Sequence, residues 1–385
     1  MQEDKQTMKL FGLPGKKFAS LVSIVVLATM VLAACGSSNG GGSTSINGNG
    51  GKGCKKIGVL LPETATSARW DGQDRPDLQR DIPATLSGAT VDYSNAQGSA
   101  DQQKTNADAA LTKGDCILVV AASDSVKAAA IVAEAKADNV PVIAYDRLIQ
   151  SNDLAYYVSF DGVAVGNLQG QYIVDHYKQY VKPGHVNTVM IKGSQTDNNA
   201  ILFAQGAHQK LDPLFASGAL KNVYEQFTPG WDNPTAQTEM QAALTKTNND
   251  IQIAYVSNDG MAGTVIAALK QQHLNGKVLV TGQDATVAGL QNILLGDQTM
   301  TVFKDISLEA QAAANIVAAI SNGTSTSSLT NGVTTKTQGG ANIPSVLETP
   351  QAIDKSNVMT VITAGGAALA DVCKGLPSGT GGICP

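Results

Sequence analysis

Short runs of apolar, mostly β-branched residues recur along the chain, and longer stretches with helical spacing separate them. One such run occupies 140–145 and ends abruptly in the charged pair Asp146 and Arg147. Apolar runs without polar alternation are typical of strands that are buried on both faces of a parallel sheet. Because strands and helices alternate almost throughout, the pattern predicts an α/β fold whose parallel sheets carry helices on both faces.

The apolar runs place the expected strands along the whole chain. Strands are predicted at 55–61, 89–95, 116–121, 140–146, 155–161, 186–192, 223–228, 251–257, 278–282, 299–304 and 358–363. Helices are predicted in most of the segments between them, and the polar stretch 322–340 is predicted to be a loop. The strands at 155–161 and 299–304 are expected to carry the chain from one half of the fold to the other.

One part of the pattern occurs twice. The sequence Ala-Ala-Leu-Thr-Lys stands at 109–113 and again at 242–246. Each copy leads into a strand, an Ala-rich helix and a second strand, which ends at Asp146 in one case and Asp284 in the other. This repeat predicts one α/β half built twice. We therefore expect two lobes with a cleft between them and the two carboxylates facing each other across it.

The start of the chain has the layout of a secretion signal. A basic end precedes an apolar run over 19–34, and small residues lead into Cys35. This layout predicts a bacterial lipoprotein signal peptide over 1–35, with Cys35 as the lipidated residue. A transmembrane helix is the alternative, but the apolar run is slightly short for one. The segment 36–53 is nearly all Gly, Ser and Asn, which predicts a flexible tether between the membrane and the folded body.

The remaining cysteines are even in number. In an oxidising compartment they are expected to form disulfides. Cys54 and Cys116 each begin an apolar strand, and Cys373 and Cys384 bracket a short Gly/Pro loop, so these two pairs are the predicted bonds. Four free thiols are the alternative. No pair has the C-x-x-C spacing of a zinc or redox site.

These elements predict how the folded body is divided. The expected parts are a first lobe of 54–158 plus 305–330, a second lobe of 159–304 plus 340–370, and a C-terminal tail of 371–385 that holds the second disulfide. The formal net charge of −5 argues against nucleic acid as a partner.

Polar and aromatic residues stand just beyond the predicted strands, where open α/β sheets bind their ligands. The candidate ligand-binding residues are Arg69, Trp70, Asp146, Arg147, Asp197, Asn199, Trp231, Asn258, Asp284 and Lys304. A sugar hydroxyl both donates and accepts hydrogen bonds, so it can lie between carboxylates and cations. The two tryptophans can pack on the C–H faces of a sugar ring. A phosphate site would instead cluster Gly amides and cations, and an amino-acid site would need fewer carboxylates.

Other interpretations of these residues remain open. Any single Asp at a strand end can simply cap the next helix, and Asp124 and Asp259 are interpreted as caps. Asp146 and Asp284 have the residue types of a glycosidase pair. However, the neighbouring cations should keep both ionised, whereas an acid catalyst needs a raised pKa. In addition, no G-x-S-x-G elbow follows a predicted strand, and the sequence lacks an H-E-x-x-H motif and a Walker loop. We therefore expect a binding protein without catalytic residues or a cofactor.

Several motifs occur in the order and spacing of a known family. They include Ala144-Tyr145-Asp146-Arg147, Ser257-Asn258-Asp259, Gly282-Gln283-Asp284 and the run 299–304. Through them, 55–362 resembles the bacterial D-xylose-binding proteins, which are type I solute-binding proteins of ABC sugar importers. The resemblance implies two Rossmann-like lobes with parallel sheets, joined by three hinge crossings. The segment 66–68 departs from the family pattern, which is more charged there.

The resemblance also implies roles for the candidate residues. In the family, sugar hydroxyls are bound at the positions that match Arg69, Asp146, Arg147, Asp197, Asn199, Asn258, Asp284 and Lys304. A Trp at the position of Trp231 stacks on the ring, and Trp70 would cover its other face. The calcium loop of the galactose binders is not evident, so no metal is expected.

The sequence thus predicts a monomeric, extracytoplasmic receptor that is held by a lipid on the outer face of the cell membrane. It would capture a monosaccharide, with D-xylose as the first candidate, and deliver it to the permease of an ABC transporter. One alternative is a binder of glucose, galactose, arabinose or a polyol autoinducer that serves chemosensing. Another is the sensing core of a transcription regulator, which the signal peptide and the missing helix-turn-helix disfavour.

Overall fold

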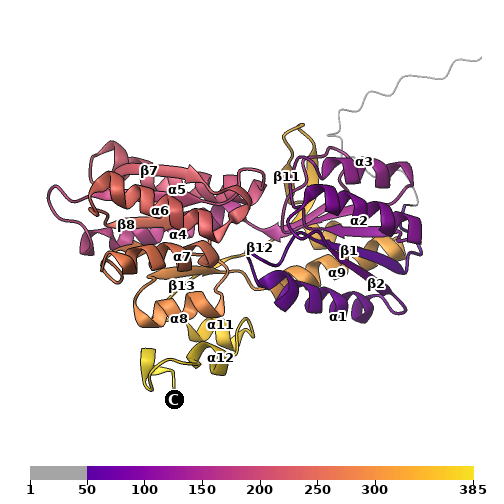
Figure 1. Cartoon of the computed structure of the whole chain (residues 1–385). Helices are drawn as coiled ribbons and strands as arrows, with labels where there is room; N and C mark the ends of the chain where they lie inside the picture. Colours follow the sequence, from indigo (N-terminus) through magenta and orange to yellow (C-terminus); the bar gives the residue numbers. More distant parts are fainter. Residues whose placement is uncertain (1–49) are drawn as a thin grey trace, which may run out of the picture. The chain divides into compact units, whose positions relative to one another are not determined.

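The computed structural model describes residues 50–385. The predicted signal peptide, Cys35 and most of the predicted tether lie outside the described residues. Within 50–385, no helix is both long and apolar enough to cross a membrane. The described chain forms two lobes, each built around a sheet (Figure 1).

The first lobe contains a seven-stranded sheet with the order β11-β12-β5-β4-β3-β1-β2. All neighbouring pairs are parallel except β11 with β12. The strands are β1 (Lys56–Leu61), β2 (Thr90–Asn95), β3 (Ile117–Val120), β4 (Val142–Tyr145), β5 (Tyr156–Phe160), β11 (Thr334–Lys336) and β12 (Asn342–Glu348). The helices are α1 (Arg75–Thr85), α2 (Ala100–Lys113), α3 (Ala129–Ala137), α9 (Ile306–Asn322) and α10 (Ser327–Thr330).

Helices cover both faces of this sheet, because successive strand residues point to opposite sides. Val59 of β1 belongs to a core cluster with Ile82 of α1 and Ile316 of α9. The next residue, Leu60, belongs to a second cluster with residues of α2 and α3, among them Ile131. Both sides of β1 are therefore buried, which explains its unbroken apolar sequence.

The second lobe contains a parallel four-stranded sheet with the order β7-β6-β8-β9, and an antiparallel pair, β10 with β13. The strands are β6 (Asn187–Lys192), β7 (Lys221–Phe227), β8 (Ile253–Val256), β9 (Leu279–Val280), β10 (Met300–Phe303) and β13 (Gln351–Asp354). The helices are α4 (Gly162–His176), α5 (Asn198–Ala216), α6 (Asn233–Thr247), α7 (Asp259–Gln271), α8 (Val287–Leu295), α11 (Met359–Thr363) and α12 (Leu369–Cys373), with the short turns η2 (Tyr177–Gln179), η3 (Pro229–Trp231) and η4 (Thr380–Gly382).

Glycine allows the close approach of α4 and α5, which pack side by side. A Cβ atom on Gly166 would lie 1.9 Å from the carbonyl oxygen of Phe203, and one on Gly206 would lie 2.2 Å from that of Val163. Any larger residue would push the helices apart. This contact fixes the start of α5, which carries Asn199.

The chain passes between the lobes three times, as Figure 1 shows. The passages lie between β5 and α4, between β10 and α9, and between β12 and β13. The predicted fold class, two α/β lobes with parallel sheets and three crossings, is therefore confirmed.

The structure corrects the sequence analysis near the C-terminus. The segment 340–370 was predicted to belong to the second lobe, but β12 pairs with β5 of the first lobe. Pro344 obscured this strand, because proline cannot donate to a sheet ladder. The pairing of β12 with β5 begins only after this proline, at Ser345. The polar stretch 322–340 also contains α10 and β11, not only loop.

The strand predicted at 358–363 is the short helix α11. Its β-branched residues favour a strand, but tertiary packing overrides that preference. Val358 and Val361 lie three residues apart and are both buried, whereas Met359 is exposed. That spacing places the two valines on one face of a helical turn.

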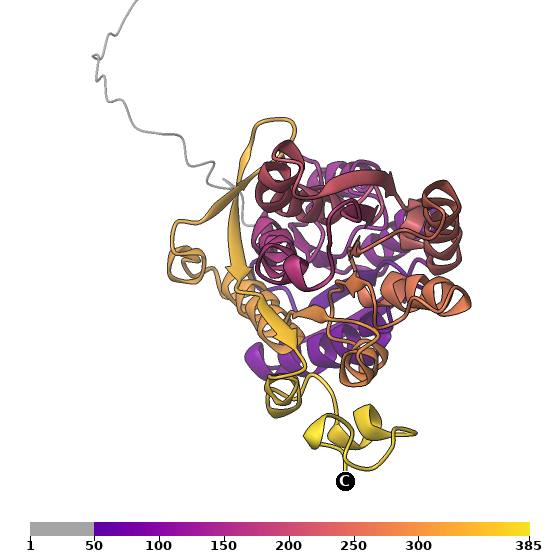
Figure 2. The ribbon, with the colours of Figure 1, turned by 90° about the vertical axis from the view of Figure 1, so that its left-hand side faces the viewer.

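Both predicted disulfides are present in the structure. Cys54 and Cys116 are joined with a Cα–Cα distance of 5.6 Å beside the neighbouring strands β1 and β3. Cys373 and Cys384 are joined at 5.3 Å and close the end of the chain. Residues 355–385, here called the C-terminal appendage, pack against α8 (Figure 2, yellow).

Candidate ligand-binding site

The predicted site residues converge on one cavity between the lobes. The empty space of the cavity, part of which is open to solvent, is about 330 Å³. All the candidates line it, namely Arg69, Trp70, Asp146, Arg147, Asp197, Asn199, Trp231, Asn258, Asp284 and Lys304. Four further residues that were not predicted as site residues also line it: Thr66, Ser67, Phe203 and Gln283.

Asp146 directly follows β4 and has a left-handed backbone, with φ of 58°. This conformation is uncommon for a residue other than glycine and needs support from its surroundings. The support comes from β5, because the Ser159 hydroxyl donates to the Asp146 carbonyl at 2.7 Å and the Tyr157 hydroxyl donates at 3.0 Å. The backbone is thereby fixed with the carboxylate in the cavity wall.

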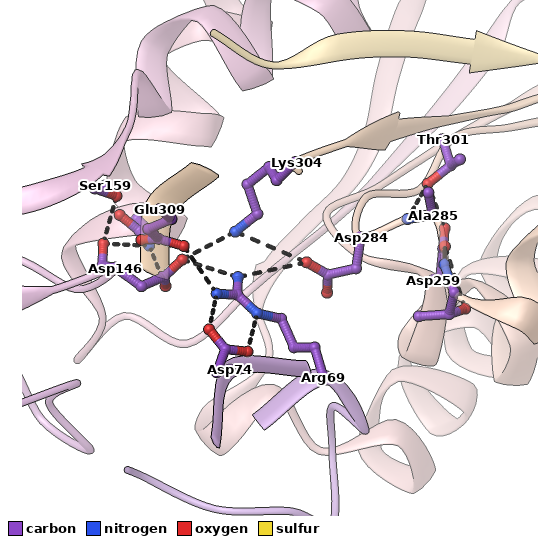
Figure 3. A network of polar contacts seen from close by, with 12 residues as sticks. Arg69, Asp74, Asp146, Ser159, Asp259, Asp284, Ala285, Thr301, Lys304 and Glu309 are labelled. Carbon is purple, nitrogen blue, oxygen red and sulfur yellow. Dashed lines mark hydrogen bonds and ion pairs between the residues drawn. The ribbon is translucent and has the colours of Figure 1, made fainter. Parts of the chain in front are cut away.

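The Asp146 carboxylate joins groups from both lobes (Figure 3). Its Oδ2 accepts from Arg69 Nη1 at 2.9 Å and from Lys304 Nζ at 3.1 Å. Its Oδ1 accepts from the amide of Asn199 at 3.0 Å. Burial opposes ionisation, but the charges of Arg69, Lys304 and Arg147 outweigh it and lower the pKa of this carboxyl. Asp146 is therefore an anion in the folded protein.

Arg69 stands at the start of the π-helical turn η1 (Trp70–Asp74). Its Nε and Nη2 donate to Asp74 at 2.8 and 2.6 Å, and Nη2 also donates to Glu309 at 3.1 Å. With the bond from Nη1 to Asp146, four of the five N–H groups of a guanidinium are used. One N–H on Nη1 is left for a ligand, and Asp284 Oδ1 lies 4.0 Å from that nitrogen.

Asp74 and Glu309 form a buried acidic layer behind Arg69 that the sequence analysis missed. Both are fully buried, and burial raises the pKa of each carboxyl. The Tyr145 hydroxyl also donates to Asp74, at 2.8 Å. The signal that could have revealed Glu309 is its place in the Ala-rich run of α9, where a lone carboxylate lies among residues that become buried.

Asp197 joins the second pair of opposite charges across the lobes. Its Oδ2 lies 2.9 Å from Nε of Arg147 and accepts from the indole N–H of Trp231 at 3.1 Å. Its Oδ1 accepts from the backbone N–H of Asn199 and so caps α5. The capping role and the place in the cavity wall therefore coexist in one residue.

The position of Trp231 depends on a glycine. A Cβ atom on Gly193 would lie 2.1 Å from the Trp231 ring, so the ring rests against the Gly193 backbone. Phe203 meets it edge-on with centroids 6.3 Å apart. Phe203 follows Asn199 by one helical turn on α5, which is the signal that could have identified it as a lining residue.

Trp70 supplies the other aromatic wall. The guanidinium carbons of Arg69 and Arg147 lie 4.5 and 5.1 Å from the centroid of its ring. These distances are within the range of cation–π contacts. Part of the ring is therefore engaged by cations, in addition to the part that borders the cavity.

The second-lobe strand ends supply the remaining candidates. Asp284 Oδ1 lies 3.8 Å from Lys304 Nζ, so Asp146 and Asp284 lie beside the same two cations, Arg69 and Lys304. The repeat in the sequence predicted only that the two carboxylates face each other across the cleft. Asn258 caps α7 by accepting from the backbone N–H of Met261 at 2.9 Å. This bond uses the side-chain carbonyl oxygen of Asn258 and leaves its amide hydrogens available for other hydrogen bonds.

Four residues that line the cavity each have a buried polar side-chain atom with no hydrogen-bond partner among residues 50–385. The atoms are Asn199 Oδ1, Gln283 Oε1, Trp70 Nε1 and Ser67 Oγ. Buried polar groups are nearly always paired, so acceptors and donors left together indicate a ligand that offers both. Gln283 directly precedes Asp284, and its place at the end of the same strand is the signal for it as a lining residue.

The described residues 50–385 contain no group of three or more His, Cys, Asp or Glu side chains that could hold a metal. The charges in the cavity are instead matched by side chains of opposite sign. The expectation of a metal-free site stays a prediction.

The chain is similar to known proteins over most of its length. Residues 58–325 match the family described as periplasmic binding protein domain. The D-xylose-binding periplasmic protein of Escherichia coli strain K12 is 37% identical over 311 residues, which cover 81% of this chain and 90% of that protein. The multiple sugar-binding periplasmic receptor ChvE of Rhizobium radiobacter is 33% identical, with 83% of this chain and 92% of that protein covered.

A solved structure is similar in fold as well as in sequence. It is an ABC transporter solute-binding protein from Clostridium phytofermentans with bound β-D-glucose. It matches with a TM-score of 0.75 and 30% identity, covering 83% of this chain and 100% of that chain. The matched segment 58–325 contains every candidate site residue, whereas the C-terminal appendage lies beyond it.

Proposed function

The chain belongs to the periplasmic binding protein domain family, and we propose that it captures a monosaccharide in the cavity between its lobes. The observation that carries this proposal is the set of unpartnered donors and acceptors in the cavity wall, beside carboxylates and cations that already neutralise one another. A neutral polyol satisfies such a wall, because each hydroxyl donates once and accepts as well.

D-Xylose is the first candidate among the sugars. The relatives from Escherichia coli and Haemophilus influenzae, each 37% identical, are D-xylose-binding proteins. The structural neighbour with bound β-D-glucose makes glucose the second candidate.

Capture would work by closure of the lobes. Arg147 and Asn199 already contact residues of the opposite lobe, Asp197 and Asp146. A sugar that fills the remaining donors and acceptors adds contacts that exist only when the lobes are together. It therefore shifts the population to the closed state. No proton transfer is required, since the cations around Asp146 keep it ionised.

The test is a calorimetric titration of the purified protein with D-xylose, D-glucose, D-galactose, L-arabinose and D-ribose. A thermal-shift series would accompany it, because a ligand that binds only the folded state raises the melting temperature. We expect saturable binding of D-xylose, and loss of more than about tenfold in affinity for Asp284→Ala. Binding of several sugars would indicate a multiple-sugar receptor. If none of these sugars binds, the proposal is wrong and polyol signals become the next ligands to titrate.

Anchoring and delivery extend the proposal. We propose that Cys35 carries a lipid that holds the protein on the outer face of the membrane, and that an ABC permease receives the sugar. Metabolic labelling with a fatty acid should mark the wild type and not Cys35→Ala. Sugar uptake by cells should fall when the protein is deleted. Intact uptake with lost chemotaxis would favour the chemosensing alternative instead.

A further inference from the structure

A buried carboxylate beside the cavity has no role in the function described so far. Asp259 is the first residue of α7, and its side chain is almost fully buried. The sequence analysis interpreted Asp259 as a helix cap, but the cap is the preceding residue, Asn258. The Asp259 carboxylate is therefore free to bond elsewhere.

The carboxylate accepts hydrogen bonds from two other segments of the second lobe, 298–301 and 283–286. Its Oδ1 accepts from Gln298 Nε2 and from the Thr301 hydroxyl, each at 2.8 Å. Its Oδ2 accepts from the backbone N–H of Thr286 at 2.8 Å. In addition, the backbone N–H of Asp259 donates to the carbonyl of Gln283 at 2.9 Å. These bonds connect the start of α7 to β10 and to the segment 283–286.

The segment 283–286 contains Asp284 and has a strained backbone. Asp284 has φ of 99° and Ala285 has φ of 47°, both in the left-handed region that side chains other than glycine rarely adopt. Such residues keep this conformation only where the surroundings fix it. Asp259 holds the residues on both sides of Asp284. It also reaches Ala285 through Thr301, whose hydroxyl accepts from the Ala285 N–H at 3.2 Å and donates to Asp259.

The surrounding backbone is built close to this carboxylate. A Cβ atom on Gly282 would lie 2.1 Å from Asp259 Oδ1, and one on Gly289 would lie 2.2 Å from Oδ2. Figure 3 shows Asp259, Thr301 and Ala285 as a group of their own, on the far side of Asp284 from Arg69. The group thus packs on the side of Asp284 that faces away from Arg69, and it takes no part in the ion pairs around Arg69.

We propose that Asp259 is a positioning residue, whose carboxylate holds 283–286 in the conformation that presents Asp284 to the sugar. This inference rests on the proposed function, since it assigns a role within the same site. Burial, with a contribution from the charge of Asp284, raises the pKa of Asp259 to about 7. Its other partners, Gln298, Thr301 and Thr286, carry no charge. Protonation near neutral pH would weaken the acceptor that the segments 298–301 and 283–286 share.

The test is a double-mutant cycle of Asp259→Asn and Asp284→Asn, with D-xylose and D-glucose as the titrated sugars. Asparagine keeps the shape but cannot accept on both sides. We expect Asp259→Asn alone to weaken binding about tenfold, and to change it less than about twofold when Asp284 is already replaced. Additive effects, or an unchanged affinity for Asp259→Asn, would overturn the proposal. Asp354→Asn is the matched control, because that carboxylate bonds only within its own turn and should leave affinity unchanged.

Two further measurements separate positioning from general stability. Wild-type affinity should fall as the pH drops below about 7, whereas the affinity of Asp259→Asn should not change there. Thr301→Val removes the hydroxyl between Asp259 and Ala285, and should reproduce the loss of affinity even if Asp259→Asn fails to fold.

Hydrogen exchange at Ala285 and Thr286 needs no sugar, so it decides the inference even if the proposed function is wrong. Both amides should exchange faster in Asp259→Asn than in the wild type. Unchanged exchange there would show that 283–286 holds its conformation without Asp259.

Discussion

Asp146, at the end of β4 in the first lobe, accepts a hydrogen bond at 3.1 Å from Lys304, which directly follows β10 of the second lobe. Lys304 also begins the second passage between the lobes. The contact therefore lies where the cavity and a hinge meet. Both side chains are buried, so either charge without its partner would destabilise the folded protein. The pair links the charge balance of the cavity to the relative position of the lobes.

Replacing Asp146 by Asn keeps the shape of the side chain and removes the charge that Arg69 and Lys304 share. Two buried cations then lose much of their compensation. Breaking a buried ion pair costs about 3–5 kcal/mol. We expect both a lower melting temperature and sugar binding too weak to measure by calorimetry. The exposed substitution Asp101→Asn should change neither. An affinity of Asp146→Asn within threefold of the wild type would contradict this role.

Gly193→Ala should create a steric clash with the Trp231 ring, since the new methyl group would lie 2.1 Å from that ring. The ring must move, and its hydrogen bond to Asp197 must break or lengthen. We expect a loss of about tenfold or more in sugar affinity, given the contribution of buried aromatic contacts. Tryptophan fluorescence of the sugar-free protein should change as well.

The matched control for this substitution is Gly263→Ala. It lies inside α7, where a Cβ atom meets no neighbour within 4 Å. Alanine is favoured over glycine in a helix by about 1 kcal/mol, so this variant should be slightly more stable and bind sugar normally. Equal losses of affinity in both variants would mean that the effect of Gly193→Ala does not come from Trp231.

The C-terminal appendage touches the first lobe through Gln73, whose amide donates to the Gly366 carbonyl at 2.6 Å. The appendage itself packs on α8 of the second lobe, so this bond spans the two lobes. Its loss in Gln73→Ala should weaken sugar binding about two- to tenfold, the range expected for one hydrogen bond. Gln241→Ala, on the outer surface of α6, is the control. Calorimetric titration with sugar would measure the affinity of both variants. An unchanged affinity for Gln73→Ala would show that the appendage does not assist closure.

The candidate residues predicted from the sequence line one cavity because of one physical regularity. Parallel strands end at a common edge, so residues that follow them, such as Asp146 and Asp284, must gather there. Glu309 and Asp74 could not be placed in this way. They lie on helices, where the direction of a side chain depends on how the helix packs. Their contact with Arg69 follows from the packing of both helices. The local pattern, a lone carboxylate in the Ala-rich run of α9, marks only Glu309.

A second group of failures arose where local preference and tertiary structure disagree. The run at 358–363 has the β-branched composition of a strand, yet the buried face formed by Val358 and Val361 holds it as a helix. In 342–348, Pro344 disfavours a strand, yet Ser345 to Glu348 pair with β5. Asp259 was misinterpreted for a related reason. Its local position suggests a helix cap, whereas its actual partners, Thr286 and Thr301, are brought to it only by the fold.

His208 forms a charge cluster on the second lobe, away from the cavity. Its Nε2 lies 3.0 Å from Glu225 Oε1, and its Nδ1 lies 2.7 Å from Asp212 Oδ1. The bond to Glu225, opposed by partial burial, raises the pKa of His208 to about 9. The same bond lowers the pKa of Glu225 to about 2. Each shift makes the stability of the protein depend on pH.

Replacing His208 by Gln should therefore destabilise the protein only within a window of pH. The folded-state pKa of His208 lies above its ordinary 6.5, so its stabilisation is complete below pH 6.5 and is lost as the pH rises through about 9. Glu225 has a depressed pKa, so its stabilisation is present above pH 4.5 and is lost as the pH falls through about 2. The melting temperatures of wild type and His208→Gln should differ most between pH 4.5 and 6.5 and converge above pH 9. A difference that stays constant with pH for His208→Gln would mean that the pair with Glu225 is not charged in the folded protein.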